Sequence, residues 1–174
     1  MALVLNEEQQ LLRDSAKAFL AEHAPLGALR TLRDAGQTWS PGLWAAMAEM
    51  GWAGIVIPEQ FGGLEFGYVG AGVLLEECGR TLAGSPLLSS ALVCGSLLAA
   101  LGSEEQKQAL LPTIAAGESI LALALDESRR FDPAATAMAA TRDAAGYVLN
   151  GTKLHVIDGS RCCRCGRRRA VVYR

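Results

Sequence analysis

The 174-residue sequence lacks the features that take a chain into or across a membrane. Its first residues, Met-Ala-Leu-Val-Leu-Asn-Glu-Glu, include no basic segment, so no secretory signal is predicted and we expect a cytoplasmic protein. The longest apolar run, residues 86–101, is shorter than a typical membrane span and contains serine and glycine. We interpret this run as a buried helix, and no membrane partner is expected.

Acidic residues are absent from residues 161–174, which hold six of the 16 Lys and Arg residues. The first 160 residues therefore contain 10 basic and 18 acidic side chains, a net charge of −8. Because an acidic body repels phosphate groups, we expect no nucleic-acid partner.

Catalytic and metal-binding patterns are also missing from residues 1–160, which contain no recognisable Ser/His/Asp set and no metal-ligand spacing. Cys78 and Cys94 stand alone in apolar segments, where cysteine usually acts as a small buried hydrophobic residue. Hydrophobic residues make up 51% of the sequence, which excludes a disordered chain and indicates a folded core.

Two capping boxes predict helix starts in the first 118 residues. Asn6 is followed by Gln9, and Ser103 is followed by Gln106, so each pair can satisfy the first backbone amides of a helix. Pro112 is expected to kink or interrupt the second of these helices, because proline removes one helical hydrogen bond.

Three further helices are predicted between the two boxes. Ser40-Pro41 places a cap and a first-turn proline at the start of one helix. Another is expected over residues 67–78, closed by Gly79, and the third from Ser85-Pro86 to Gly102. Consecutive helices thus fill residues 1–118.

The pattern changes to short apolar runs after residue 118. Residues 119–125 and 136–141 are predicted strands. Asn150-Gly151 separates the runs 147–149 and 154–157, and this dipeptide favours the turn of a β-hairpin. The sequence therefore predicts an α+β fold: a mainly α-helical N-terminal domain, residues 1–118, and an incomplete antiparallel β domain, residues 119–160, with too few strands to close a barrel.

Three strings, in this order and spacing, resemble those of the acyl-CoA dehydrogenase family, and the match covers residues 3–160. They are residues 58–64 (Pro-Glu-Gln-Phe-Gly-Gly-Leu), residues 101–118, which begin Leu-Gly-Ser-Glu-Glu-Gln-Lys, and residues 147–153 (Tyr-Val-Leu-Asn-Gly-Thr-Lys). In that family a helical domain, a β domain and a C-terminal helical bundle enclose FAD and an acyl-CoA. A glutamate of the bundle removes the α-proton, and the flavin takes the β-hydride.

The resemblance implies FAD as cofactor and assigns flavin contacts to two strips. Where the family typically has Thr-Glu-Pro, this sequence has Asp126-Glu127-Ser128, so only the glutamate keeps its identity. A carboxylate beside the flavin would disfavour the anionic reduced flavin, and Ile157 replaces a threonine that could donate a hydrogen bond, so both departures argue against normal flavin use. His155 stacks on the flavin edge or is an ordinary strand histidine. The assigned residues are Leu123, Leu125, Asp126, His155 and Ile157.

The resemblance stops near residue 160, and residues 161–174 form a Cys/Arg-rich tail. Arginine and cysteine codons commonly read CGN and TGY, so reading one base later gives codons that begin with G and encode residues such as Val and Ala. The family continues with a Val/Ala-rich strand at this point. We therefore predict a shifted reading frame between about Asp158 and Arg161, real or from sequencing.

The expected function is that of a fragment of an FAD-dependent acyl-CoA dehydrogenase, inactive alone because the domain of the catalytic base is missing. By resemblance its partners are acyl-CoA and other acyl-CoA dehydrogenase subunits, in homo- or hetero-oligomers. One alternative is a non-catalytic helical subunit that pairs with a catalytic acyl-CoA dehydrogenase partner. Another is an adaptor that binds metal or RNA through the Cys/Arg-rich tail.

Overall fold

Both predicted capping boxes are present in the structure, a computed structural model that describes residues 4–143 and 146–159. The Asn6 side chain accepts a hydrogen bond from the Gln9 amide at 2.8 Å, and the Gln9 side chain accepts one from the Asn6 amide at 3.1 Å. This box starts α1 (Glu7–His23), and the box of Ser103 and Gln106 starts α6 (Glu104–Ala115). The two helix starts are therefore confirmed.

Pro112 does not interrupt α6, which continues to Ala115. Its neighbours Leu111 and Ile114 are fully buried in the same core cluster, so their packing holds the turn together despite one missing hydrogen bond.

The two helices after α1 differ in how far the sequence predicted them. The start of α3 (Pro41–Glu49) at Ser40 is confirmed, since the Ser40 side chain accepts a hydrogen bond from the Leu43 amide. Helix α2 (Leu26–Asp34) was not predicted, and its first turn follows Pro25 without any side-chain cap. A helix without a cap leaves little local pattern to predict it from.

Helix α4 (Gly67–Thr81) passes through Gly79, so the prediction that Gly79 closes it is wrong. The chain leaves the helix at Leu82, whose φ of 54° lies in the left-handed region. The amides of Leu82 and Ala83 then donate to the carbonyls of Gly79 and Cys78, which satisfies the helix end three residues later than predicted.

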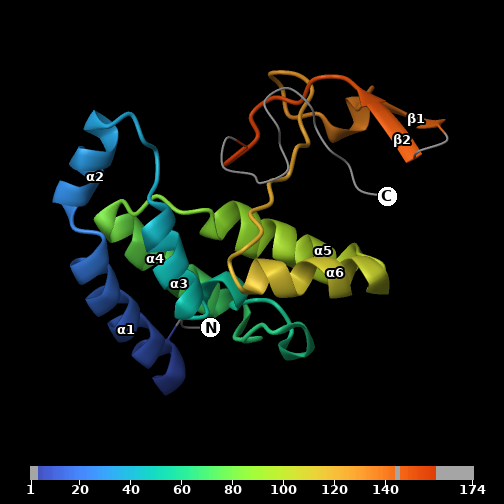
Figure 1. Cartoon of the computed structure of the whole chain (residues 1–174). Helices are drawn as coiled ribbons and strands as arrows, with labels where there is room; N and C mark the ends of the chain where they lie inside the picture. The colour runs from blue at the N-terminus through green and yellow to red at the C-terminus, as the bar shows by residue number, and fades with distance from the viewer. Residues whose placement is uncertain (1–3, 144–145, 160–174) are drawn as a thin grey trace.

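The predicted helix from residue 85 to residue 102 consists of two parts. The first, η3 (Leu87–Cys94), is a π-helix, and it continues directly into α5 (Gly95–Leu101). Figure 1 shows α5 and α6 side by side. Short 3-10 turns complete the list of helices: η1 (Trp52–Gly54), η2 (Glu59–Phe61) and η4 (Pro133–Ala135).

The core consists of two hydrophobic clusters. The larger joins α1, α3, α4 and η3 around side chains such as Leu20, Met47 and Leu74, all fully buried. The smaller joins Ile57 to Leu111 and Ile114 of α6. Both clusters lie in the helical body.

Antiparallel strands β1 (Ala139–Asp143) and β2 (Gly146–Asn150) form a hairpin set apart from the helices (Figure 1). Ala139 pairs with Asn150, so Asn150-Gly151 lies at the far end of β2 and the predicted hairpin turn there is wrong. Residues 154–157 form no strand. The Leu154 amide donates to the Asp126 carbonyl at 2.7 Å, so it does not pair with β2 as the predicted hairpin would require.

The predicted strand at residues 119–125 has no ladder partner among the described residues, so that prediction is also wrong. The predicted strand at 136–141 is shifted to β1. The α+β fold class is nevertheless confirmed: a helical body followed by a small antiparallel sheet.

The predicted reading-frame shift, between Asp158 and Arg161, and the Cys/Arg-rich tail concern residues that are almost all outside the described ranges. Within the ranges 4–143 and 146–159, no helix has the length and apolar character needed to cross a membrane. The same ranges contain no group of three or more His, Cys, Asp or Glu side chains placed to hold a metal ion.

Candidate functional site

A cavity of about 380 Å³ lies between η3 and the two extended segments near residues 125 and 155. All five residues that the resemblance assigned to the flavin line this one cavity, although they come from two strips that are far apart in the sequence. The full lining is Leu88, Ser89, Val93, Leu123, Leu125, Asp126, His155 and Ile157.

The helical wall of the cavity is the π-helix η3, which the sequence analysis did not identify as part of the site. Leu88, Ser89 and Val93 all come from this segment. π-Helical segments are rare and occur frequently at functional sites. Nothing in the sequence distinguishes this stretch from an ordinary apolar helix, so the composition offered no signal for it.

Ser90 of η3 fixes the first extended segment against the helix. Its buried hydroxyl donates to the Ser119 carbonyl at 3.3 Å and accepts from the Leu121 amide at 3.0 Å. Because Leu121 is two residues before Leu123, these bonds set where the first strip enters the cavity wall.

Glu127 and Lys153 join the two strips behind the cavity. The Lys153 ammonium donates to the Leu125 carbonyl at 3.0 Å and lies 2.8 Å from Glu127 Oε1. The Glu127 carboxylate also accepts from the amides of Ala137 and Met138 at 2.6 and 3.0 Å. We call these two side chains the Glu127–Lys153 clasp. The hydrogen bond from Lys153, followed by that from the Ala137 amide, lowers the pKa of Glu127.

The second strip is tied to η3 by another carboxylate. Ser89 is buried, and its hydroxyl donates to Asp158 Oδ2 at 2.7 Å. His155 and Asp158 both adopt left-handed backbone conformations, with φ of 52° and 56°. Residues other than glycine rarely adopt this conformation, and such strained positions cluster at functional sites.

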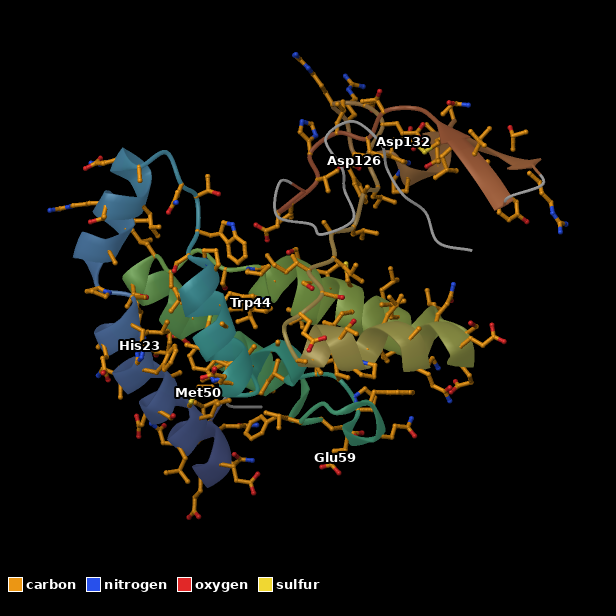
Figure 2. All side chains as sticks on the ribbon, viewed as in Figure 1. His23, Trp44, Met50, Glu59, Asp126 and Asp132 are labelled. Carbon is orange, nitrogen blue, oxygen red and sulfur yellow. The ribbon has the colours of Figure 1, made fainter. Side chains whose placement is uncertain are left out.

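One polar atom of the cavity lining, on the Asp126 side chain, lacks a hydrogen-bond partner among the described residues. This atom, Oδ1, is buried. Figure 2 shows Asp126 to the left of the hairpin, on the extended segment. A buried acceptor without a donor typically costs about 1–3 kcal/mol, so a bound group with an N–H would be stabilised there.

These residues fit a flavin ring. Flavin is a flat, largely apolar ring system with N–H and C=O groups along part of its edge, and the cavity offers aliphatic side chains from both walls plus one unmet acceptor. Its volume is at the low end for small-molecule sites, so it suits the ring rather than a whole dinucleotide.

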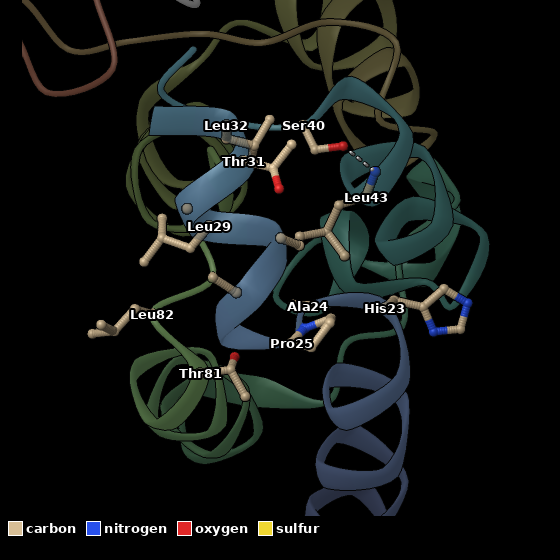
Figure 3. Close-up of a pocket in the computed structure, with 13 residues that line it drawn as sticks. His23, Ala24, Pro25, Leu29, Thr31, Leu32, Ser40, Leu43, Thr81 and Leu82 are labelled. Carbon is tan, nitrogen blue, oxygen red and sulfur yellow. Dashed lines mark hydrogen bonds between the residues drawn. The ribbon is translucent and has the colours of Figure 1, made fainter. Parts of the chain in front are cut away.

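A second cavity, of about 370 Å³, lies between α2, α3 and the end of α4 (Figure 3). The hydroxyls on its wall are already hydrogen-bonded: Thr31 to the Gly27 carbonyl, Ser40 to the Leu43 amide and Thr81 to the Cys78 carbonyl. It therefore offers no unmet polar group comparable with Asp126 and is the weaker candidate.

The cysteines predicted to be buried are buried: Cys78 and Cys94 are each 6% exposed. Burial, with a smaller contribution from Glu77, raises the pKa of the Cys78 thiol to about 11. The thiolate is the nucleophilic form of cysteine, so both the burial and the raised pKa disfavour Cys78 as a nucleophile at neutral pH.

Comparison with known proteins gives a consistent family. Residues 6–118 match the family model "Acyl-CoA dehydrogenase, N-terminal domain". Curated relatives include the mitochondrial isovaleryl-CoA dehydrogenase of Solanum tuberosum, 32% identical over 91% of this chain and 39% of the relative. Another is the acyl-CoA dehydrogenase IpdE2 of Mycobacterium tuberculosis, 36% identical over 69% of this chain and 37% of the relative. The chain thus spans about 40% of the length of these relatives.

Solved structures agree in fold. One, from work on the electron transferring flavoprotein of Acidaminococcus fermentans, superposes with a TM-score of 0.83 at 30% identity, over 93% of this chain and 43% of that one. The acyl-CoA dehydrogenase of Geobacillus kaustophilus gives a TM-score of 0.80 at 29% identity over the same shares. The ChsE4-ChsE5 complex of Mycobacterium tuberculosis gives 0.81 at 27% identity, also over 93% and 43%.

Proposed function

The chain belongs to the acyl-CoA dehydrogenase family, and from this premise we propose that it forms the helical part and one wall of the flavin site of an FAD-dependent acyl-CoA dehydrogenase. One observation carries the proposal. Two strips that the resemblance assigned to flavin contact meet at a single cavity with an unmet hydrogen-bond acceptor.

In this proposal the residues of the chain bind and orient the ring. Leu88 and Val93 supply apolar contacts from η3, and Leu123, Leu125 and Ile157 supply them from the extended strips. When bound, FAD supplies the electron sink that accepts a hydride from the β-carbon of an acyl-CoA thioester. The apolar walls also exclude water from the ring face, which protects the reduced cofactor from side reactions.

We further propose that the 174-residue chain does not oxidise acyl-CoA by itself. By resemblance, the glutamate that removes the α-proton belongs to a C-terminal helical bundle, and this chain matches about 40% of the length of its relatives. FAD binding and catalysis are therefore separable: the cavity lining is in the chain, and the base is expected outside it.

The proposal is tested by titrating the full chain with FAD and following the flavin absorbance and equilibrium dialysis. Leu123→Asp places a charge in the cavity wall and should weaken FAD binding at least tenfold. Leu97→Asp is the matched control, because Leu97 is equally exposed (42%, against 41% for Leu123) but lies outside the cavity. Absence of FAD binding by the unaltered chain would refute the flavin site, and reduction of an electron acceptor with acyl-CoA would refute the inactivity.

The alternative function is a helical subunit that pairs with a catalytic acyl-CoA dehydrogenase, and one surface favours it. Leu97 and Leu101 stand four positions apart on α5, which is the spacing of one helix face, and they are 42% and 78% exposed. Two of the matched structures are of paired proteins, ChsE4-ChsE5 and the steroid acyl-CoA dehydrogenase Tcur3481-Tcur3483. Co-expression with a full-length family member should then give a complex that Leu101→Asp disrupts, whereas separate elution of the two chains would count against pairing.

A further inference from the structure

Three carboxyl groups lie around the cavity, and what we infer from them rests on the proposed function. Two of the three have protein partners: Glu127 bonds Lys153 and two backbone amides, and Asp158 accepts from Ser89. Asp126 Oδ1 has none among the described residues, although it is buried.

Any ring that fills the cavity removes water from the Asp126 carboxyl group. An apolar edge placed there would leave the carboxyl group without water and its Oδ1 atom without a donor from the described residues, which is costly for a polar or charged group. A ring N–H placed there would instead satisfy it. The cavity therefore selects ligands that present a hydrogen-bond donor toward Asp126.

The same carboxylate penalises negative charge on the bound ring. A two-electron-reduced flavin is either neutral, with its ring nitrogens protonated, or an anion that has lost one ring proton. A like charge within a few ångströms raises the pKa at which the second negative charge forms, and burial strengthens the effect. The neutral form offers one more N–H and carries no charge, so both effects favour it.

Other titratable side chains of the described residues also lie near the cavity. The Lys153 ammonium, behind the strips, is engaged by Glu127 and by the Leu125 carbonyl. Asp158, on the opposite strip, accepts a hydrogen bond from Ser89. His155 lines the cavity on that strip and is the one group there that could carry a positive charge.

We propose that Asp126 is a positioning residue that accepts a hydrogen bond from a ring N–H and holds the reduced flavin of this site in its neutral form. By resemblance, the matching family pattern has threonine at this position. A threonine hydroxyl carries no charge and would leave the protonation equilibrium of the flavin unbiased.

The test uses the full chain loaded with FAD, photoreduced without oxygen and titrated across neutral pH while the absorbance spectrum distinguishes neutral from anionic reduced flavin. In the unaltered chain the anion should appear about one pH unit higher than in Asp126→Asn, a tenfold change in the ratio of the two forms. Asp132→Asn is the matched control: the same chemical change on an exposed residue of the neighbouring loop, outside the cavity (Figure 2), should leave the transition unmoved. Asp126→Thr serves as a second variant in case the first does not fold.

The outcomes separate this inference from the proposed function. A higher transition pH in the unaltered chain and in Asp132→Asn, but not in the two Asp126 variants, supports it. Equal transitions in all four chains overturn it while the flavin site stands. Failure of the unaltered chain to bind FAD overturns both the flavin site and the role of Asp126.

Discussion

Gly63 belongs to one of the three strings that carried the family resemblance. Its replacement by alanine adds only one methyl group but should destabilise the fold strongly. A Cβ at this position would lie 1.9 Å from the Ile57 carbonyl oxygen and 2.4 Å from the Ile57 carbonyl carbon. Both are backbone atoms, so no side-chain rotation relieves the clash. Ile57 is fully buried against α6, which prevents it from moving away.

We expect Gly63→Ala to lower the free energy of unfolding by about 3 kcal/mol, the upper end of the usual cost of overpacking. Gly72→Ala is the control for the same chemical change. Gly72 lies in the middle of α4, and its added Cβ would meet no atom within 4 Å. Alanine is favoured over glycine within a helix by about 0.5–1 kcal/mol, so this variant should be more stable than the unaltered chain.

Urea unfolding followed by far-UV circular dichroism measures the difference. The two variants should differ by about 4 kcal/mol, which at a slope of 1–3 kcal/mol per molar corresponds to midpoints at least about 1.3 M apart. Failure of Gly63→Ala to fold agrees with the direction of the effect. Equal midpoints for the two variants would refute the close approach of the turn at residues 62–63 to Ile57.

Two further predictions concern titratable groups. Because the pKa of Glu127 is lowered in the fold, the Glu127–Lys153 clasp contributes stability above the ordinary carboxyl pKa near 4.5 and loses it as the pH falls through the lowered value. The protection factors of the Ala137 and Met138 amides, which compare the observed exchange rate with that of an unfolded chain at the same pH, should therefore fall in acid, and Glu127→Gln should remove that acid dependence. Cys78, with its pKa raised to about 11, should resist alkylation at neutral pH until urea unfolds the chain, and modification of the folded chain at the rate of a small thiol would contradict its burial.

The helix starts could be predicted from the sequence because each depends on residues only three positions apart. The pair Asn6 and Gln9 is enough to predict a helix start, because both of its hydrogen bonds form within one helical turn. The same locality explains the misses. The end of α4 depends on Leu82 adopting a left-handed conformation, which no residue preference predicts, and α2 has no cap at all.

The hairpin prediction failed because it used a dipeptide, Asn150-Gly151, whereas the pairing of strands depends on residues far apart in the sequence. The turn dipeptide would have placed residues 154–157 against 147–149. Instead β2 pairs backward with β1, and Leu154 donates to the Asp126 carbonyl, 28 positions earlier in the chain. The π-helical wall of the cavity was not predicted either, because the residues of η3 are of the same types as those of an ordinary buried α-helix.

The five residues that the resemblance assigned to the flavin nevertheless line one cavity, although both strips were assigned the wrong secondary structure. Their meeting depends on contacts between distant segments. The two strips are joined directly by the Glu127–Lys153 clasp and by the hydrogen bond from the Leu154 amide to the Asp126 carbonyl. Lys153→Met should therefore weaken FAD binding while the thermal unfolding of the helical body stays close to that of the unaltered chain. Lys107→Met is its control, because Lys107 is similarly buried (19% exposed, against 12%) but pairs with Glu104 within α6. Equal FAD affinities in the two variants would mean that the clasp does not hold the cavity together, and that the Leu154–Asp126 backbone hydrogen bond and the contacts of Ser89 and Ser90 are enough to keep the strips in place.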